Sequence, residues 1–381
     1  MHLEDYNQRV MRLLMTCKDA MQWKDSVVFP RLPSINTITS YKNDGRINQI
    51  PKRFHRVSIR DVEGRDYFKE NQDGLINHHC KVLNYNIFND NLPILPAGLI
   101  PDHFTKIIVY GLIEVGSIPP FTTHLYLESK TSDRQEIYKQ LFPETLEVLD
   151  ISNGVIGKSN SNIDDLLPPN IKKLFIEAFL VHPYLFKLKQ LNCLTIKKVC
   201  DVYYHHHTKC LYASCHLEPT TLLAGSIPLS VTTLFLDGYF EVEKGAITSS
   251  VTTLGLVDTD PPNYSNLPAD SISTLFIIGL KDQLDATLYP KSIKYFGIYG
   301  EYEFALKSCI PPSTKYFDYQ NSDTSKIKFH SNDIPNGVTH IRLGCQFDES
   351  LVPGFIPDSC EYLEFSSIYD REPFWWSCQR V

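Results

Sequence analysis

The chain lacks a long hydrophobic run and an excess of charge of one sign. No window of 18 or more of its 381 residues is apolar throughout, which excludes a hydrophobic transmembrane helix. Its 37 Lys and Arg against 44 Asp and Glu give a formal net charge of −7, which argues against a nucleic-acid-binding protein. Charged residues interrupt the first thirty positions, so a secretory signal is not expected. Since 43% of the residues are apolar, the composition indicates a folded, soluble protein.

The sequence signatures of common enzyme centres are also missing. It contains no Gly-x-Gly-x-x-Gly, no Walker phrase, no Gly-x-Ser-x-Gly and no His-Glu-x-x-His. A glycosidase needs two carboxylates within about 5–10 Å of each other. Asp150 and Asp318 are too far apart in the repeat described below, and Asp164 and Asp165 precede a proline turn. We therefore predict no catalytic residue and no cofactor.

The ten cysteines do not indicate a disulfide framework, because reduced thiols are expected in a cytoplasmic protein without a secretion signal. Four of them fill apolar positions of the repeat described below: Cys80, Cys210, Cys215 and Cys360. Cys200 and Cys210 flank three consecutive histidines at 205–207. This spacing matches no structural zinc pattern, so we interpret the segment as a polar insertion and predict no metal site.

The 24 prolines, by contrast, recur within one phrase. Ile227-Pro228-Leu-Ser-Val-Thr-Thr-Leu-Phe-Leu236 resembles Leu167-Pro168-Pro-Asn-Ile-Lys-Lys-Leu-Phe-Ile176 and Ile334-Pro335-Asn-Gly-Val-Thr-His-Ile-Arg-Leu343. We name the residue three positions after the proline v. Fifteen copies place v at Phe54, Cys80, Phe104, Thr122, Leu146, Ile171, Leu191, Cys210, Val231, Val251, Ile272, Ile293, Thr314, Val338 and Cys360. The mean step is about 22 residues, within the leucine-rich-repeat range.

Positions v+3 and v+5 are apolar in all fifteen copies. Apolar residues two apart indicate a short strand with alternate side chains buried, and the proline suits the turn before it. A single strand in each step favours a solenoid, in which each coil buries its apolar face against the next. We predict a mainly β, leucine-rich-repeat-like solenoid of about 15 coils with short parallel strands and a small helical N-terminal cap.

The phrase resembles the FNIP repeat, a short leucine-rich-repeat relative found in social amoebae and in giant viruses of amoebae. The closest copies run from Ile227 to Phe240 and from Ile334 to Asp348, and Phe88-Asn89 is a fragment of the name motif. The copy around Cys210 has lost its signature, so we expect an irregular coil or insertion between residues 199 and 219. The resemblance implies a cytoplasmic location, in the host cytoplasm if the chain is viral.

The N-terminal segment allows two interpretations. Residues 5–29 resemble the latter half of an F-box, a helical module that docks on the adaptor of a cullin-type ubiquitin ligase. The same apolar spacing also suits a simple cap that closes the first coil. We divide the chain into a cap or F-box remnant at 1–30, a solenoid at 31–371 and an apolar C-terminal cap at 372–381.

Side chains at v+2, v+4 and v+6 are expected to project from the strand face, which such solenoids use for binding. The expected partner-binding residues are Tyr126, Phe175, Phe235, Phe276, Tyr295, Tyr316, Asp318, His340, Arg342, Tyr362 and Glu364. Two interpretations stay open for the aromatic residues: a contact surface or stacking that supports the sheet. Asp318, Arg342 and Glu364 occupy v+4 on successive coils and are expected to form a solvent-exposed charge ladder.

The sequence therefore predicts a non-enzymatic protein-interaction scaffold, with a protein as its partner and neither nucleic acid nor membrane. The resemblance adds a sharper hypothesis, that the chain is a substrate receptor for a cullin-type ubiquitin ligase. The alternative is a carbohydrate-active or carbohydrate-binding β-helix, which would stack three strands in each coil and cluster carboxylates in a cleft.

Overall fold

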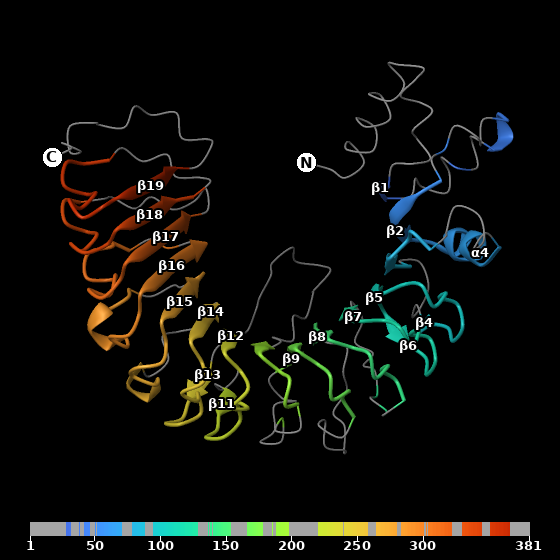
Figure 1. The fold of residues 1–381 in the computed structure, drawn as a ribbon, viewed down its shortest axis with the longest axis horizontal. Coiled ribbons are helices and arrows are strands. Elements are labelled where there is room, and N and C mark those ends of the chain that lie inside the picture. Colours follow the sequence, from blue (N-terminus) through green and yellow to red (C-terminus); the bar gives the residue numbers. More distant parts are fainter. Residues whose placement is uncertain are drawn as a thin grey trace, which may run out of the picture. The chain divides into compact units, whose positions relative to one another are not determined.

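The fold is described from a computed structural model (Figure 1). It describes residues 28–31, 38, 42–45, 50, 52–70, 78–87, 94–128, 136, 138, 140–153, 166–177, 185, 188–197, 220–238, 240–257, 264–279, 283–300, 302, 304–321, 330–344 and 351–365. The chain divides into two compact units, an N-terminal unit (Met1–Leu174) and a C-terminal unit (Phe175–Val381).

The N-terminal unit contains one ladder of parallel strands in chain order. Its strands are β1 (Phe29–Arg31), β2 (Phe54–Ile59), β3 (Val82–Tyr85), β5 (Lys106–Tyr110), β7 (His124–Glu128) and β8 (Val148–Asn153). Two further strands, β4 (Ile94–Leu95) and β6 (Leu112–Ile113), form a separate parallel pair. Strand β1 pairs with β2 although it starts inside the segment that we assigned to the N-terminal cap.

The C-terminal unit repeats this arrangement, and Figure 1 shows β14 to β19 stacked in order. Strand β9 (Lys173–Glu177) crosses the boundary between the units. The parallel ladder then contains β10 (Cys193–Lys197), β12 (Thr233–Asp237), β14 (Thr253–Val257), β15 (Thr274–Ile278), β16 (Tyr295–Gly300), β17 (Tyr316–Asn321), β18 (His340–Leu343) and β19 (Tyr362–Phe365). A second pair joins β11 (Thr220–Leu222) to β13 (Phe240–Val242), and the connections include two 3₁₀ turns, η5 (Tyr264–Asn266) and η6 (Ala286–Leu288).

This architecture confirms the predicted leucine-rich-repeat-like solenoid of short parallel strands. Residues that pair across the ladder occupy the same position in consecutive copies of the repeat, as Thr253 and Thr274 do at v+2. Tyr316 and His340 pair in the same way. The pairs β4–β6 and β11–β13 each join only two strands. Among the described residues, the connections therefore carry no second long sheet of the kind expected for a carbohydrate-active β-helix.

The predicted set of about 15 coils includes one wrong copy of the repeat, the copy with v at Cys210. Strand β10 pairs directly with β12, and Cys193 lies opposite Thr233. A strand following Cys210 would have to lie between β10 and β12, so that copy of the repeat is not part of the ladder. The predicted irregular coil or insertion between residues 199 and 219 lies outside the described residues.

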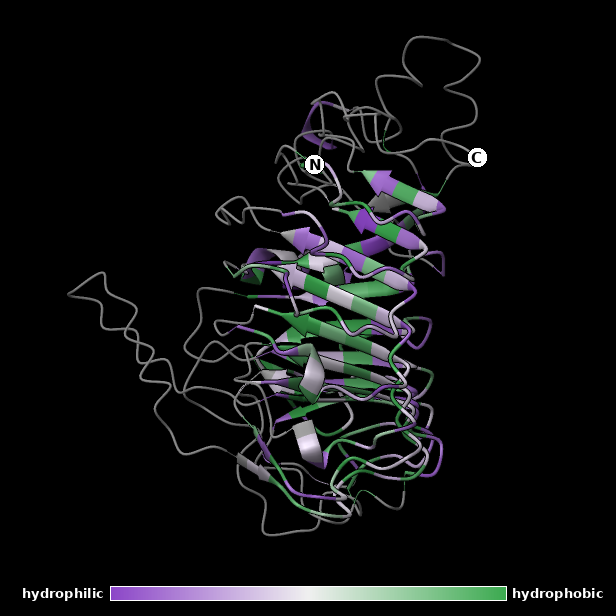
Figure 2. Ribbon diagram, turned by 90° about the vertical axis from the view of Figure 1, so that its left-hand side faces the viewer, coloured by the Kyte–Doolittle hydropathy of each residue, from purple (hydrophilic) through white to green (hydrophobic). Residues whose placement is uncertain are grey.

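The buried core consists of residues at the positions predicted from the repeat. In the described coils before the last one, the residues at v, v+3 and v+5 are buried, as Val231, Leu234 and Leu236 illustrate at 0% exposure each. Figure 2 shows hydrophobic and less hydrophobic residues alternating along the strands. In the last coil, Leu363 and Phe365 are only half-buried. Burial at period 2 is thus what gives each strand its register.

The proline turn has a repeated geometry. The amide of v donates to the carbonyl of the proline three residues earlier, from Val231 to Pro228 at 3.0 Å and from Val338 to Pro335 at 3.3 Å. Proline has no N–H to leave unsatisfied there, so it fits the first position of the turn.

A helix among the described residues interrupts the β pattern, and the sequence did not predict it. Helix α4 (Val62–Glu70) lies in the connection between β2 and β3, where the spacing from v at Phe54 to v at Cys80 is longer than the mean step. The Asp61 side chain accepts a hydrogen bond from the Gly64 amide at 2.6 Å and caps the helix. Phe68 is buried, and its ring centroid lies 6.1 Å from that of Phe104, so the helix is fixed by the core of the unit.

Candidate interaction face of the C-terminal unit

The residues predicted for partner binding are divided between the two units. Tyr126 lies on β7 in the N-terminal unit, where the Lys106 ammonium lies 4.8 Å from the centre of its ring. Phe175 lies on β9 at the boundary and is half-buried. The other nine residues lie on β12 to β19, where the structure brings them together. We call these nine residues and their contacts the C-terminal strand face.

Position v+2 forms a ladder of rings across four consecutive strands. Tyr295 stacks on Tyr316 with ring centroids 6.2 Å apart, and Tyr316 contacts His340 at 4.5 Å. His340 in turn lies 5.8 Å from Tyr362. The register of β16 to β19 places these four residues opposite one another, so their contacts follow from the repeat itself.

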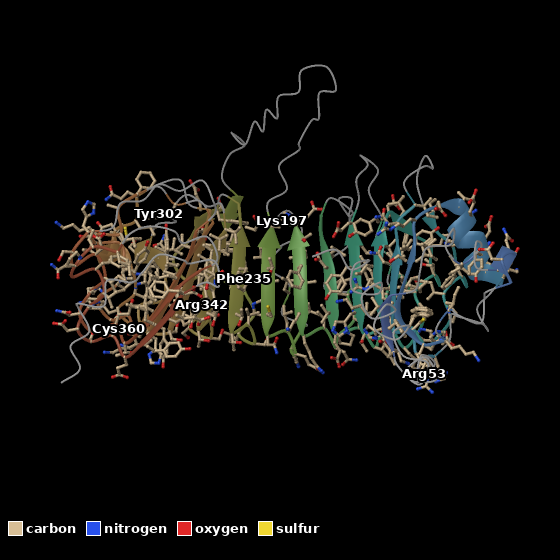
Figure 3. All side chains as sticks on the ribbon, turned by 90° about the horizontal axis from the view of Figure 1, so that it is seen from above. Arg53, Lys197, Phe235, Tyr302, Arg342 and Cys360 are labelled. Carbon is tan, nitrogen blue, oxygen red and sulfur yellow. The ribbon has the colours of Figure 1, made fainter. Side chains whose placement is uncertain are left out.

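Position v+4 begins with two phenylalanines separated by a glycine. Phe235 and Phe276 stack with centroids 6.3 Å apart, although they are two strands from each other. A Cβ at Gly255, on the strand between them, would collide with the ring of Phe235. Phe276 also meets Tyr295 edge-on at 5.5 Å. The glycine lets large rings lie flat on the sheet, which supports the stacking interpretation for Phe235 and Phe276. Figure 3 labels Phe235 over the strands.

Asp318 is the polar centre of the face. Its Oδ2 accepts hydrogen bonds from the hydroxyls of Tyr295 at 3.0 Å and Tyr299 at 2.8 Å. The amide nitrogen of Gln320 lies 3.3 Å from Oδ1. The residue is only 2% exposed, so the expectation that Asp318 faces solvent was wrong. The backbone register does point it away from the core, but longer side chains from its own and the neighbouring strands cover it.

The predicted charge ladder is present. The Arg342 guanidinium lies 3.8 Å from Oδ2 of Asp318 and 3.5 Å from Oε1 of Glu364. The side chains of Arg342 and Glu364 are 52% and 45% exposed, whereas that of Asp318 is 3% exposed. Arg342, labelled in Figure 3, therefore links a buried carboxylate to the surface.

The tyrosines of this cluster are neutral donors. Burial raises the pKa of the Tyr299 hydroxyl, and its hydrogen bonds with Tyr295 and Asp318 raise it further. Burial is also the main cause of the raised pKa of Tyr295. Because both phenols keep their protons, both can donate to the Asp318 carboxylate. Tyr299 and Gln320 lie at v+6, and their roles were missed although this column was also expected to face outward.

The accessible part of the face is smaller than the predicted set. Tyr316 and Tyr362 are 44% and 56% exposed, while Phe235, Phe276 and Tyr295 are half-buried. The exposed residues of the face are therefore Tyr316, Arg342, Tyr362 and Glu364, with the half-buried His340 in contact with both tyrosine rings. They combine two accessible rings with one cation and one anion.

The remaining candidates contribute no chemistry in the described part of the chain. Cys80 and Cys309 are buried cysteines. No group of three or more potential metal ligands occurs among the described residues, and the cysteine and histidine segment at 200–210 lies outside them. No helix of the described residues is long and apolar enough to cross a membrane.

Comparison with known proteins identifies the repeat. A family model described as FNIP Repeat matches residues 327–367, which include β18 and β19, so this stretch is an FNIP repeat. A solved structure described as CroV588, a novel circular LRR protein, is similar to this chain with a TM-score of 0.47 and 17% identity. The similarity covers 85% of this chain but only 45% of that one. No curated protein matches the sequence.

Proposed function

We propose that this FNIP and leucine-rich-repeat-like solenoid is a non-enzymatic scaffold that holds a protein partner on its C-terminal strand face. The observation that carries the proposal is the pair of exposed rings, Tyr316 and Tyr362, which flank His340 next to Arg342. Tyrosine and arginine are the residues enriched at the centres of protein interfaces.

The surroundings of these rings favour binding. Tyr316 stacks on Tyr295 and contacts the tilted ring of His340, and Arg342 is anchored by Asp318. Side chains that are already ordered lose little conformational entropy when a partner binds. A partner would therefore meet a fixed surface of rings rimmed by opposite charges.

Asp318 serves this scaffold as a structural acceptor. A general acid or base must reach a substrate, whereas Asp318 is covered by the side chains that donate to it. This arrangement supports a binding surface in preference to a reaction centre.

The sharper proposal, a substrate receptor for a cullin-type ubiquitin ligase, rests on the F-box resemblance of residues 5–29. Most of this segment lies outside the described residues. A deletion of residues 1–27 tests it without removing β1, which begins at Phe29.

Affinity purification from amoebal lysate tests both proposals. Tyr316→Ala/Tyr362→Ala should lose partners that the wild-type chain enriches. Leu229→Ala/Leu288→Ala, which removes side chains of residues 75% and 53% exposed on the connections, should retain them. Thermal unfolding of each variant checks the fold. Equal enrichment by the tyrosine and leucine variants would refute the proposal that the strand face binds partners. If no chain enriches any protein, the scaffold proposal is refuted. If the chain lacking residues 1–27 still captures ligase components, the adaptor proposal fails.

A further inference from the structure

Basic side chains gather where three strands of the N-terminal unit begin. We name the five residues Arg53, His78, His79, Lys81 and His103 the basic edge. Arg53 directly precedes β2, Lys81 directly precedes β3, and His103 lies three residues before β5. Because β2, β3 and β5 are parallel neighbours, their first residues lie along the same edge of the sheet. Arg53 is labelled at the margin of this unit in Figure 3.

Contacts between the coils show that these groups are close. The Lys81 ammonium donates to the carbonyl of His103 at 3.4 Å, and the rings of His78 and His79 lie 4.0 Å apart. Partial desolvation lowers the pKa of His79, and His78, Arg53 and Lys81 lower it further. The pKa of His103 is likewise lowered by burial and then by Lys81 and His78. His79 and His103 thus experience the positive potential of their neighbours.

The cations of the basic edge are not neutralised within the described part of the chain. Neither Arg53 nor Lys81 has a carboxylate within 4.0 Å there. Lys172, in contrast, pairs with Glu147 at 2.8 Å on later coils of the same unit. Asp102, which precedes His103 in the chain, raises the pKa of His103, but its effect is smaller than those of burial, Lys81 and His78.

The charge of the chain is also unevenly distributed. Counted over Met1–Leu174, 21 Lys and Arg balance 21 Asp and Glu, a net charge of zero. The C-terminal unit holds the remaining 37 − 21 = 16 basic and 44 − 21 = 23 acidic residues, a net charge of −7. The overall negative charge, which argued against a nucleic-acid-binding protein, therefore belongs to the C-terminal unit, and the N-terminal unit has no net charge to oppose the basic edge.

We propose that the basic edge binds an acidic, extended segment of a partner polypeptide. Three neighbouring strands span about 10 Å, the length of about three extended residues. Carboxylates along such a segment would accept charge-assisted hydrogen bonds from Arg53 and Lys81. This site is separate from the C-terminal strand face, so the proposal for it can fail or succeed without affecting the proposal for that face.

The same surface fits other anionic partners less well. A single-stranded nucleic acid stacks its bases on accessible rings, whereas the His103 ring is stacked on Phe104 at 4.6 Å and the two rings at 78 and 79 contact each other. An anionic membrane is recognised by Lys and Arg clustered on an amphipathic helix or beside a transmembrane helix, whereas Arg53 and Lys81 lie next to the strands β2 and β3.

Fluorescence polarisation with a labelled decaglutamate peptide tests the proposal. The full chain should bind it, and binding should weaken as salt is raised because screening shortens the range of charge interactions. Arg53→Glu/Lys81→Glu should weaken binding at least tenfold. The matched control, Lys291→Glu/Lys294→Glu, reverses two exposed cations of the C-terminal unit, and Lys294 occupies the same v+1 position as Lys81. It should change affinity less than twofold.

A neutral variant, Arg53→Gln/Lys81→Gln, tests the site without introducing repulsion and should weaken binding at least threefold, with circular dichroism to check folding. The proposal is overturned if the wild-type chain does not bind decaglutamate, or if the two charge-reversed variants lose affinity equally. Tighter binding of a ten-nucleotide RNA or of phosphatidylserine vesicles, abolished by the same substitutions, would overturn the choice of partner. Loss of self-association in Arg53→Glu/Lys81→Glu would identify a second copy of the chain instead.

Discussion

At the scale of single residues, Asp318 decides what kind of surface the C-terminal strand face presents. Its position in the repeat directs it away from the core, yet it is only 2% exposed because Tyr295, Tyr299 and Arg342 gather over it. A buried carboxylate remains charged only where donors replace the water that it has lost. Asp318 therefore organises the residues that surround it, and the exposed residues meet any partner.

Replacing Asp318 with Asn should destabilise the protein by about 1–3 kcal/mol, because hydrogen bonds to a charged acceptor contribute more than neutral ones. Asn keeps the shape but loses the charge that holds Arg342 and accepts from the two phenols. Denaturant unfolding measures the change. Asp270→Asn is the control, because Asp270 is exposed on a turn of the same unit.

The control should change stability by less than about 0.5 kcal/mol, as is usual for surface positions. If Asp318→Asn also stays within that limit, the four donors around the carboxylate contribute no net stability, and the description of Asp318 as an organising residue is wrong.

At the scale of elements, seven described coils share a turn at the position six residues before v. Five of the residues there are glycines with positive φ, at positions 98, 116, 225, 245 and 354. Ser308 and Asn332 occupy the same position with φ of 64° and 63°. The turn therefore imposes a left-handed conformation, and glycine adopts it without the steric cost that other residues incur.

Two substitutions should consequently shift stability in opposite directions. Ser308→Gly should stabilise the protein by about 0.5–1 kcal/mol, and Gly245→Ala should destabilise it by about 1 kcal/mol. A Cβ at Gly245 would meet no atom within 4 Å, so its cost is confined to the backbone. Thermal or denaturant unfolding gives both changes. Shifts of the same sign would show that backbone conformation does not govern this turn.

The ladder could be predicted from the sequence because burial at v, v+3 and v+5 is local to each strand. The glycines that recur at v−6 could likewise have predicted the turn of the coil from the sequence. Helix α4 was missed because its stability depends on Phe68 reaching Phe104 on a later coil. The burial of Asp318 was missed for a related reason. Alternation along a strand gives the direction of a side chain, whereas its exposure depends on the length of its neighbours' side chains.

At the scale of the whole molecule, a solenoid is stabilised mainly by contacts between neighbouring coils, so its ends are expected to be its weakest parts. The C-terminal unit shows this gradient. Ile341 and Leu343 on β18 are 1% and 0% exposed, whereas Leu363 and Phe365, the equivalent residues on β19, are half-buried. An end strand also leaves one edge of backbone donors and acceptors to be covered.

We predict that the apolar segment at 372–381 covers this last coil. Deleting it should increase amide exchange in β19 at least tenfold, because the strand then opens more readily, and should leave β15 unchanged. Hydrogen exchange followed by mass spectrometry measures both strands in one experiment. Trp375→Ser/Trp376→Ser in the full-length chain keeps the length and removes only the apolar cover, so it should reproduce the effect on β19. Unchanged exchange of β19 in both variants would mean that the segment does not cap the solenoid, and its tryptophans would then be free to serve a partner instead.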